Sequence, residues 1–189
     1  MKNIDTTKYF VIEDKAGVKT SNIFKEMQKL FDVWSYYDDT RLDNDFPAPQ
    51  KTTTRYFEKN IEADEEFKNM SANDLERQGI KGITLRERLL MEIEYFKETG
   101  GHLDIDNITL CSGSRNSDGS VPGVGWYGDD RKVCVDWYGP SRSYLSLRAR
   151  AAQFLTLDSS SFNPVPELTI ESLHHKVDIL LDHFGLRNK

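Results

Sequence analysis

The chain has 189 residues, of which 38% are hydrophobic and 30% charged, and its formal net charge is −6. This composition is typical of a globular protein and argues against a disordered tract. The acidic balance argues against a dedicated duplex-DNA binder, because such proteins bind phosphates with Lys and Arg. The sequence contains no run of about 18 apolar residues, so no membrane span is expected, and its N-terminus lacks the apolar core of a signal peptide. We therefore expect a single domain over residues 1–189 in a cytoplasmic or virion-associated protein.

The first part of the chain predicts two strands and one helix. Residues 8–12 and 52–57 are rich in aromatic and β-branched side chains, as strands are. Across residues 21–36, apolar residues recur at spacings of three and four, which predicts a helix that buries a stripe including Trp34. Ser21 is placed to cap the N-terminus of this helix.

The middle of the chain predicts a loop and then the longest helix. Residues 38–54 combine several Asp residues with a Pro-Ala-Pro break and lack the regular Asp spacing of a calcium-binding loop, so we expect a solvated loop. Thr84 and Glu87 have the spacing of a capping box, and Gly100 is placed to end a helix in the left-handed conformation. These signals predict a helix over residues 85–99.

The last part of the chain predicts a strand and a further helix. Residues 145–150 alternate between apolar or small and polar side chains, which favours a strand. We expect Arg148 and Arg150 to hydrogen-bond carbonyl groups and carboxylates where this strand enters the domain. Residues 169–185 show helical caps and an apolar face, so a helical extension is predicted over residues 166–189.

Three β-prone segments, residues 108–115, 121–127 and 132–138, are separated by turn sequences that contain Asp and Gly. If the second turn is a four-residue loop, Trp126 pairs with Val133, and the alternation of side chains fixes which residues share a face. One face is expected to belong to the core and carries Cys111, Val124, Trp126, Val133, Val135 and Trp137. The other face is mostly small and polar and carries Leu110, Ser112, Ser114, Gly123, Gly125, Tyr127, Lys132, Cys134, Asp136 and Tyr138.

The small, polar face of this meander has two interpretations. It is either a solvent-exposed sheet surface or a binding surface, since Tyr, Ser, Gly, Asp and Asn are the residues that adaptable binding surfaces use. Gly123 and Gly125 indicate that another group approaches the strand backbone closely. Cys111 and Cys134 lie on opposite faces, so we expect no disulfide bond between them.

Three runs of sequence carry a resemblance to a known family. They are LCSGSRNSDGSVPGVGW (110–126), KVCVDWYGPSRSY (132–144) and LRARAA (147–152). Together they resemble the C-terminal variable region of C-type-lectin-like proteins of the formylglycine-generating-enzyme type, and their pattern is most similar to the variable proteins of diversity-generating retroelements. The resemblance covers residues 100–155 and implies an α+β, C-type-lectin-like fold with two main helices and a late antiparallel β meander, to which this chain adds a C-terminal helix.

The resemblance implies a ligand-binding protein with no catalytic residue, cofactor or metal ion. In that family a reverse transcriptase copies a template with errors at adenines, and the resulting changes fall on exposed residues of the binding face. Residues 100–155 would then form a β-rich variable region that binds an unknown protein or surface ligand. Carried over by position, the variable ligand-binding set is Asn116, Ser120, Gly123, Gly125, Tyr127, Lys132, Cys134, Asp136, Tyr138, Ser141, Ser143 and Tyr144.

Two other classes of function stay open at this point. The chain could be a structural or regulatory interaction protein of a phage that contacts its partner through its helices. It could instead be a metal-dependent enzyme in which His102, Asp104 and Asp106 alternate as ligands on a strand. The apolar pattern shifts near Asn107, however, and predicts a turn or bulge that breaks this ligand set.

Overall fold

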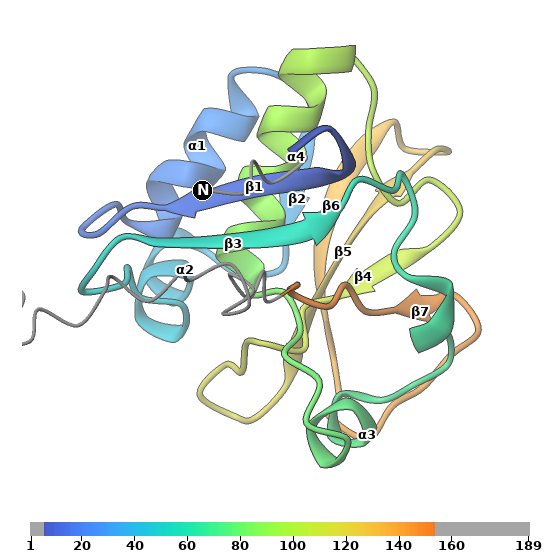
Figure 1. Ribbon diagram of the computed structural model, residues 1–189. Helices are drawn as coiled ribbons and strands as arrows, with labels where there is room; N and C mark the ends of the chain where they lie inside the picture. The colour runs from blue at the N-terminus through green and yellow to red at the C-terminus, as the bar shows by residue number, and fades with distance from the viewer. Residues whose placement is uncertain (1–5, 154–189) are drawn as a thin grey trace, which may run out of the picture. The chain divides into compact units, whose positions relative to one another are not determined.

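The computed structural model describes residues 6–153, which form a mixed α+β fold with two β-sheets (Figure 1). The helices and strands follow along the chain as β1 (Tyr9–Asp14), α1 (Thr20–Gln28), β2 (Val33–Ser35), α2 (Asp39–Asp45), β3 (Thr53–Glu58), α3 (Ala72–Arg77), α4 (Leu85–Thr99), β4 (Ile108–Leu110), β5 (Val121–Tyr127), β6 (Lys132–Tyr138) and β7 (Leu147–Arg148). The described residues belong to one compact unit of the chain. The predicted C-terminal helix and its extension lie outside the described residues.

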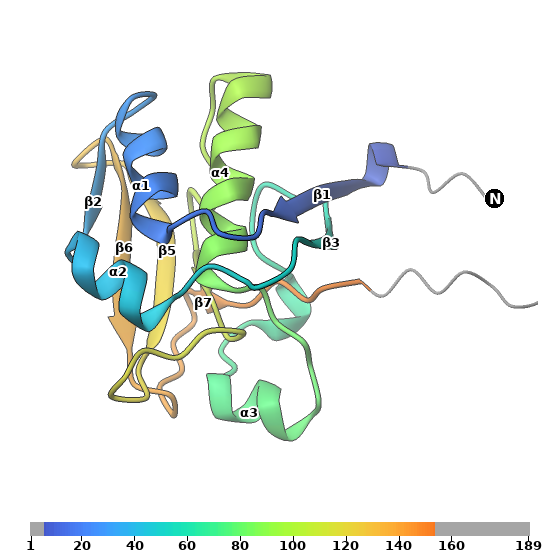
Figure 2. The same cartoon turned by 90° about the vertical axis from the view of Figure 1, so that its left-hand side faces the viewer.

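The longest helix, α4, lies between the two sheets (Figure 2). It begins at the predicted capping box, in which the Thr84 hydroxyl accepts from the Glu87 amide and the Glu87 carboxylate accepts from the Thr84 amide at 2.8 Å. It ends at Gly100, whose φ of 72° is left-handed. The predicted helix over residues 85–99 is therefore confirmed.

Two strands predicted early in the sequence form a separate antiparallel pair. β1 and β3 pair so that Phe10 lies opposite Phe57, which confirms both predicted strands. Phe10 and Phe57 are buried in the same core cluster as the apolar side of α4. This pair therefore covers the side of α4 that faces away from the larger sheet (Figure 2).

The larger sheet has five strands in the order β2-β6-β5-β4-β7. The register of its central hairpin is the predicted one, with Trp126 opposite Val133 and Val124 opposite Val135. The two edge strands, β2 and β7, run parallel to their neighbours. β7 is shorter than the strand predicted over residues 145–150.

The first strand of the meander, predicted over residues 108–115, ends at Leu110. Beyond it the chain turns toward the start of α4, where the Ser114 hydroxyl accepts a hydrogen bond of 2.9 Å from the Leu85 amide. The first amides of a helix have no partner within the helix. This segment satisfies one of them instead of extending the sheet.

The prediction of one helix over residues 21–36 is wrong beyond Gln28. α1 ends there, and Val33–Ser35 form β2; just before this strand, the Asp32 carbonyl accepts from the Val133 amide at 3.1 Å. Trp34 is consequently 45% exposed instead of buried in a helical stripe. Apolar spacing alone does not reveal that a distant strand offers hydrogen bonds to this segment.

The prediction of a loop over residues 38–54 is also wrong in part, because α2 lies within it. Asp38 caps α2 by accepting a backbone N–H at 2.9 Å. Asp43 accepts from both the amide and the hydroxyl of Ser21 at 2.9 Å. The predicted N-cap role of Ser21 is wrong, because Lys19 occupies the N-cap of α1; Ser21 instead connects α1 to α2. The acidic residues here serve helix ends and contacts between helices.

Candidate ligand-binding face

The inner face of the five-stranded sheet belongs to the core. Cys111, Val124, Val133 and Val135 are all 0% exposed, as predicted. The predicted core position of Trp137 is wrong, because this side chain is 44% exposed. Its ring contacts the exposed ring of Tyr36, with centroids 5.8 Å apart, and it takes no part in the main core cluster.

The opposite side of the sheet, which we call the outer face, is the candidate binding surface. From its strands it carries Trp34, Ile108, Leu110, Val121, Gly123, Gly125, Tyr127, Lys132, Cys134, Asp136, Tyr138 and Leu147. Trp34 lies beside Cys134 in the parallel pairing of β2 with β6. Trp34 is absent from the set predicted from the sequence, because its segment reads as a helix there.

The outer face is filled closely around its two glycines. A Cβ atom on Gly123 would lie 2.4 Å from Cε2 of Tyr138, and one on Gly125 would lie 3.0 Å from the carbonyl oxygen of Asn107. Ile108 also contacts both glycine positions. The predicted close approach to the strand backbone is therefore confirmed, and the approaching groups are residues of the chain itself.

Tyrosines dominate the polar part of the outer face. Burial raises the pKa of Tyr138, and the nearby phenol of Tyr127 adds to this shift. The Tyr138 ring also contacts the exposed ring of Tyr144 edge-on, with centroids 6.4 Å apart. Both phenols on the sheet, Tyr127 and Tyr138, have raised pKa values and are therefore uncharged hydrogen-bonding groups near neutral pH.

Two predicted site residues are structural parts of the β4–β5 turn. The amide of Asn116 donates to the carbonyl of Ser120 at 2.9 Å, and the Ser120 amide donates to the Asp118 carboxylate at 2.9 Å. Gly119 completes the turn with a φ of 86°. Asn116 and Ser120 are buried, so their side chains face the protein instead of a ligand.

The twelve predicted site residues divide into three groups by exposure. Those that are buried are Asn116, Ser120, Gly123, Gly125 and Cys134. Those that are half-buried are Tyr127, Lys132, Asp136 and Tyr138, and those that are exposed are Ser141, Ser143 and Tyr144. Sequence reasoning missed Leu145, which is 70% exposed and follows Tyr144 in the loop that also carries Ser141 and Ser143. A ligand on the outer face therefore has seven of the twelve side chains within reach.

A hollow of about 520 Å³ lies where the outer face meets the β5–β6 turn. Tyr127 and Ile105 contribute to its wall, and its charged lining residues are Asp106, Asp129 and Asp130. The lining contains no Lys or Arg side chain. This edge of the outer face therefore favours ligands that carry positive charge.

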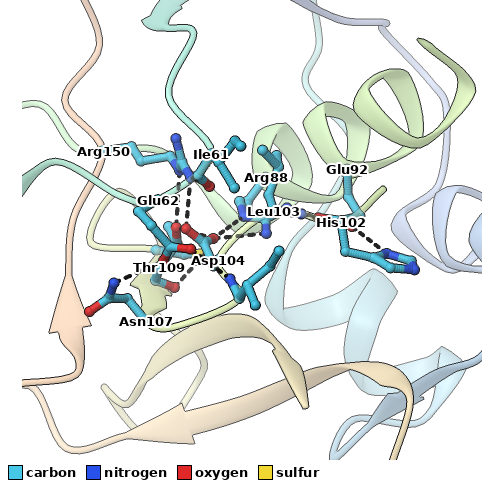
Figure 3. A network of polar contacts seen from close by, with 12 residues as sticks. Ile61, Glu62, Arg88, Glu92, His102, Leu103, Asp104, Asn107, Thr109 and Arg150 are labelled. Carbon is cyan, nitrogen blue, oxygen red and sulfur yellow. Dashed lines mark hydrogen bonds and ion pairs between the residues drawn. The ribbon is translucent and has the colours of Figure 1, made fainter. Parts of the chain in front are cut away.

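His102 and Asp104, two of the three residues considered as metal ligands, have other partners, shown in Figure 3. Arg150 and Arg88 reach the carboxylate of Asp104 at 2.7 and 2.8 Å, while His102 Nδ1 lies 2.9 Å from Glu92. Asp106 is exposed, so the three predicted ligands do not converge. Within residues 6–153, no group of three His, Cys, Asp or Glu side chains could hold a metal ion.

The two arginines of the late strand have the partners expected from the sequence. Arg150 donates to Asp104 and to the carbonyls of Asn60 and Ile61, at 2.7–2.9 Å. Arg148 forms an ion pair of 2.5 Å with Glu65. Both side chains therefore fasten the β7 segment to the domain.

Neither cysteine is disulfide-bonded, and both are buried. Cys111 lies in the core and Cys134 on the outer face, as the strand alternation predicts. Burial raises the pKa of the Cys111 thiol and also that of the Cys134 thiol. Both sulfur atoms are therefore protonated near neutral pH, the form that is a poor nucleophile.

None of the helices within residues 6–153 is both long and apolar enough to cross a membrane. Comparison of the chain with protein family models, curated proteins and solved structures gives no match.

Proposed function

We propose that this chain is a receptor-like ligand-binding protein with a C-type-lectin-like fold of the formylglycine-generating-enzyme type, whose binding face is varied by a diversity-generating retroelement. The ligand is a protein or a surface group, and it contacts the outer face together with the loop of residues 139–146. Binding requires no catalytic residue, metal ion or cofactor.

One observation carries the proposal. Along β6, Val133 and Val135 on the core side are 0% exposed, whereas Lys132 and Asp136 on the outer face are half-buried and reach solvent, although the outer-face Cys134 between them is buried. Exposed substitutions usually change the free energy of unfolding by less than about 0.5 kcal/mol. A protein whose binding residues are varied while its fold is kept needs this separation.

The chemistry of the accessible positions also suits a binding surface. Tyr127 and Tyr144 offer large, rigid ring surfaces that end in a hydrogen-bonding group. Ser141 and Ser143 add small hydroxyl groups that adapt to different partners. The paired strands β5 and β6 hold the sheet positions in a fixed geometry, which lowers the entropic cost of binding.

Sequencing the DNA that flanks the gene tests this proposal. We expect a near-copy of the codons for residues 112–146 beside a reverse-transcriptase gene, with differences concentrated at template adenines. The differences should fall on codons such as those of Tyr127 and Tyr144 and should spare the codons of Val133 and Val135. The absence of a copy, or differences spread equally over core codons, would contradict the proposal.

A further inference from the structure

A second hollow, which shares no residue with the outer face, is lined by basic side chains. Its volume is about 490 Å³, within the range of roughly 300–1,000 Å³ typical of small-molecule sites. It is formed by β3, by α3 and the connection from α3 to α4, and by the segment that follows β4. Arg55, Lys81 and Arg115 line it, and Glu76 is the one carboxylate in the lining.

Arg115 is held in place by the backbone and keeps part of its hydrogen-bonding capacity. Its Nη1 donates to the carbonyls of Ser112 and Ser114 at 2.9 and 3.0 Å. Its Nη2 reaches Glu76 at 3.3 Å, and that side chain is 75% exposed. A guanidinium group has five N–H donors, so two remain within the described residues. The weak, solvated contact with Glu76 is one that an incoming anion can replace.

Lys81 is the uncompensated charge of this hollow. Its backbone is fixed because its carbonyl accepts from the Arg55 guanidinium at 3.2 Å and from the Ala152 amide at 2.8 Å. Its side chain is exposed and forms no ion pair within residues 6–153. Arg55 is neutralised by Glu87 at 2.8 Å and Arg115 is paired with Glu76 at 3.3 Å, so the net positive charge of the hollow comes from Lys81.

The same hollow contains a hydroxyl without a partner. The Oγ atom of Ser112 is buried and forms no hydrogen bond within the described residues. It lies against Gly82, where a Cβ atom would come 1.8 Å from it, so the site depends on glycine at this position. A buried hydroxyl without a partner is unfavourable, so a rotation that brings it to an acceptor lowers the free energy.

We propose that this hollow binds a small anionic molecule through an oxyanion group, either phosphate or carboxylate. Lys81 and Arg115 supply the charge and the donors, and Ser112 supplies a hydroxyl. None of these three residues belongs to the variable set of the proposed function. The anion site would therefore stay constant in every variant of the protein. The proposal of this site does not depend on diversification of the outer face.

Calorimetric titration and thermal unfolding of the full chain test the proposal, with inorganic phosphate and citrate as probes at constant ionic strength. We expect saturable binding of at least one probe and a midpoint of unfolding that rises with its concentration. Lys81→Gln and Arg115→Gln should each weaken binding by at least about tenfold, because a charge-assisted hydrogen bond is lost. Phosphate binding without citrate binding would assign a phosphorylated ligand, and the reverse would assign a carboxylate.

Lys29→Gln is the matched control, because it removes the same charge from an exposed lysine at the end of α1. This variant should bind both probes like the unmodified chain. Ser112→Ala should weaken binding and leave the unliganded protein as stable as before, since no bond is lost. The proposal would be overturned if the Lys29 and Lys81 variants lost equal affinity for the probes. It would also be overturned if sodium chloride raised the midpoint of unfolding as much as the probes do. Since Lys81 is exposed, its variant gives an answer even if the Arg115 variant fails to fold.

Discussion

The ring of Tyr138 lies against Gly123, so closely that a Cβ atom on Gly123 would come 2.4 Å from Cε2 of the ring. Tyr138 is fixed in turn by a small cluster that contains Ala72, Leu110 and Val121. The tyrosine therefore occupies the space that any side chain at position 123 would need. Positions 123 and 138 are coupled, and the residue at one limits the residues allowed at the other.

This coupling predicts that Gly123→Ala destabilises the fold. The added methyl group forces Tyr138 out of its cluster, and such overfilling costs about 1–3 kcal/mol. Urea unfolding measures the loss as a lower midpoint at an unchanged slope. In the double mutant with Tyr138→Ala, the clash is absent. The loss of unfolding free energy in the double mutant should therefore be smaller than the sum of the losses in the two single mutants.

Gly128→Ala provides the control for this experiment. Gly128 lies in the exposed β5–β6 turn, and the nearest atom to a Cβ added there would be Nε1 of Trp126, at an ordinary contact distance of 3.8 Å. The substitution should therefore leave the midpoint nearly unchanged. Equal losses for the two alanine variants would show that backbone freedom, and not the Tyr138 ring, requires glycine at position 123.

A second prediction concerns Asp104, which is 0% exposed and faces two buried arginines. Asp104→Asn leaves Arg88 and Arg150 without their shared counter-charge, and breaking a buried ion pair in this way costs on the order of 3–5 kcal/mol. Chemical unfolding measures this loss. Asp106→Asn, at an exposed position two residues later, is the matched control and should be nearly neutral.

The same residue predicts a dependence on pH. Burial disfavours the Asp104 carboxylate, but Arg150 and Arg88 outweigh burial and hold its pKa below the ordinary value. Its stabilising contribution is complete above the unfolded pKa of about 3.9 and is lost as the pH falls through the lower folded value. The stability difference between the unmodified chain and Asp104→Asn should therefore narrow below about pH 4. A stability difference that stays constant below about pH 4 would contradict the lowered pKa of Asp104.

The elements that the sequence predicts correctly are those whose signals are local. The helix α4 is bounded by Thr84 and Gly100, each of which acts within one turn of its own position. The β5–β6 hairpin has its register fixed by a short turn and by strict alternation of side chains. Both kinds of signal are readable without knowledge of the rest of the fold.

The errors arise where a distant segment decides the local structure. Trp34 follows a helical spacing in the sequence, but hydrogen bonds from β6 make its segment a strand. Leu110 ends β4 because the start of α4 uses the following hydroxyl of Ser114. The prediction of the candidate site fails for the same reason. The sequence predicts Gly123 and Asn116 as variable binding positions, and only the three-dimensional contacts show that the chain encloses both.

A further prediction compares two tryptophans of the same sheet. Trp126 packs against the core cluster and stacks on His102, with ring centroids 3.9 Å apart, whereas Trp34 is 45% exposed on the outer face. Trp126→Ala should lower the free energy of unfolding by about 3–5 kcal/mol, and Trp34→Ala by less than about 1 kcal/mol. Denaturant titration of the two variants checks this order, and equal losses would contradict the assignment of the two faces.

The last prediction concerns which of the twelve candidate positions tolerate variation. We expect the exposed and half-buried positions outside the Tyr138 cluster to accept most substitutions without loss of folding. They are Tyr127, Lys132, Asp136, Ser141, Ser143 and Tyr144. The buried positions should accept few. They are Asn116, Ser120, Gly123, Gly125 and Cys134.

A library with each of these positions fully randomised, sorted by resistance to protease, measures this tolerance directly. Resistance to protease reports the population of the folded state when opening is fast relative to cleavage. Val133 and Val135 serve as intolerant controls because both are 0% exposed in the core. If the buried positions of the set proved as tolerant as Tyr144, the outer face would have to be more open than its contacts show, and the binding surface would extend over the glycines. If Lys132 and Asp136 proved as intolerant as the two valines, β6 could not carry a variable surface, and the binding role would fall to the loop of residues 139–146 alone.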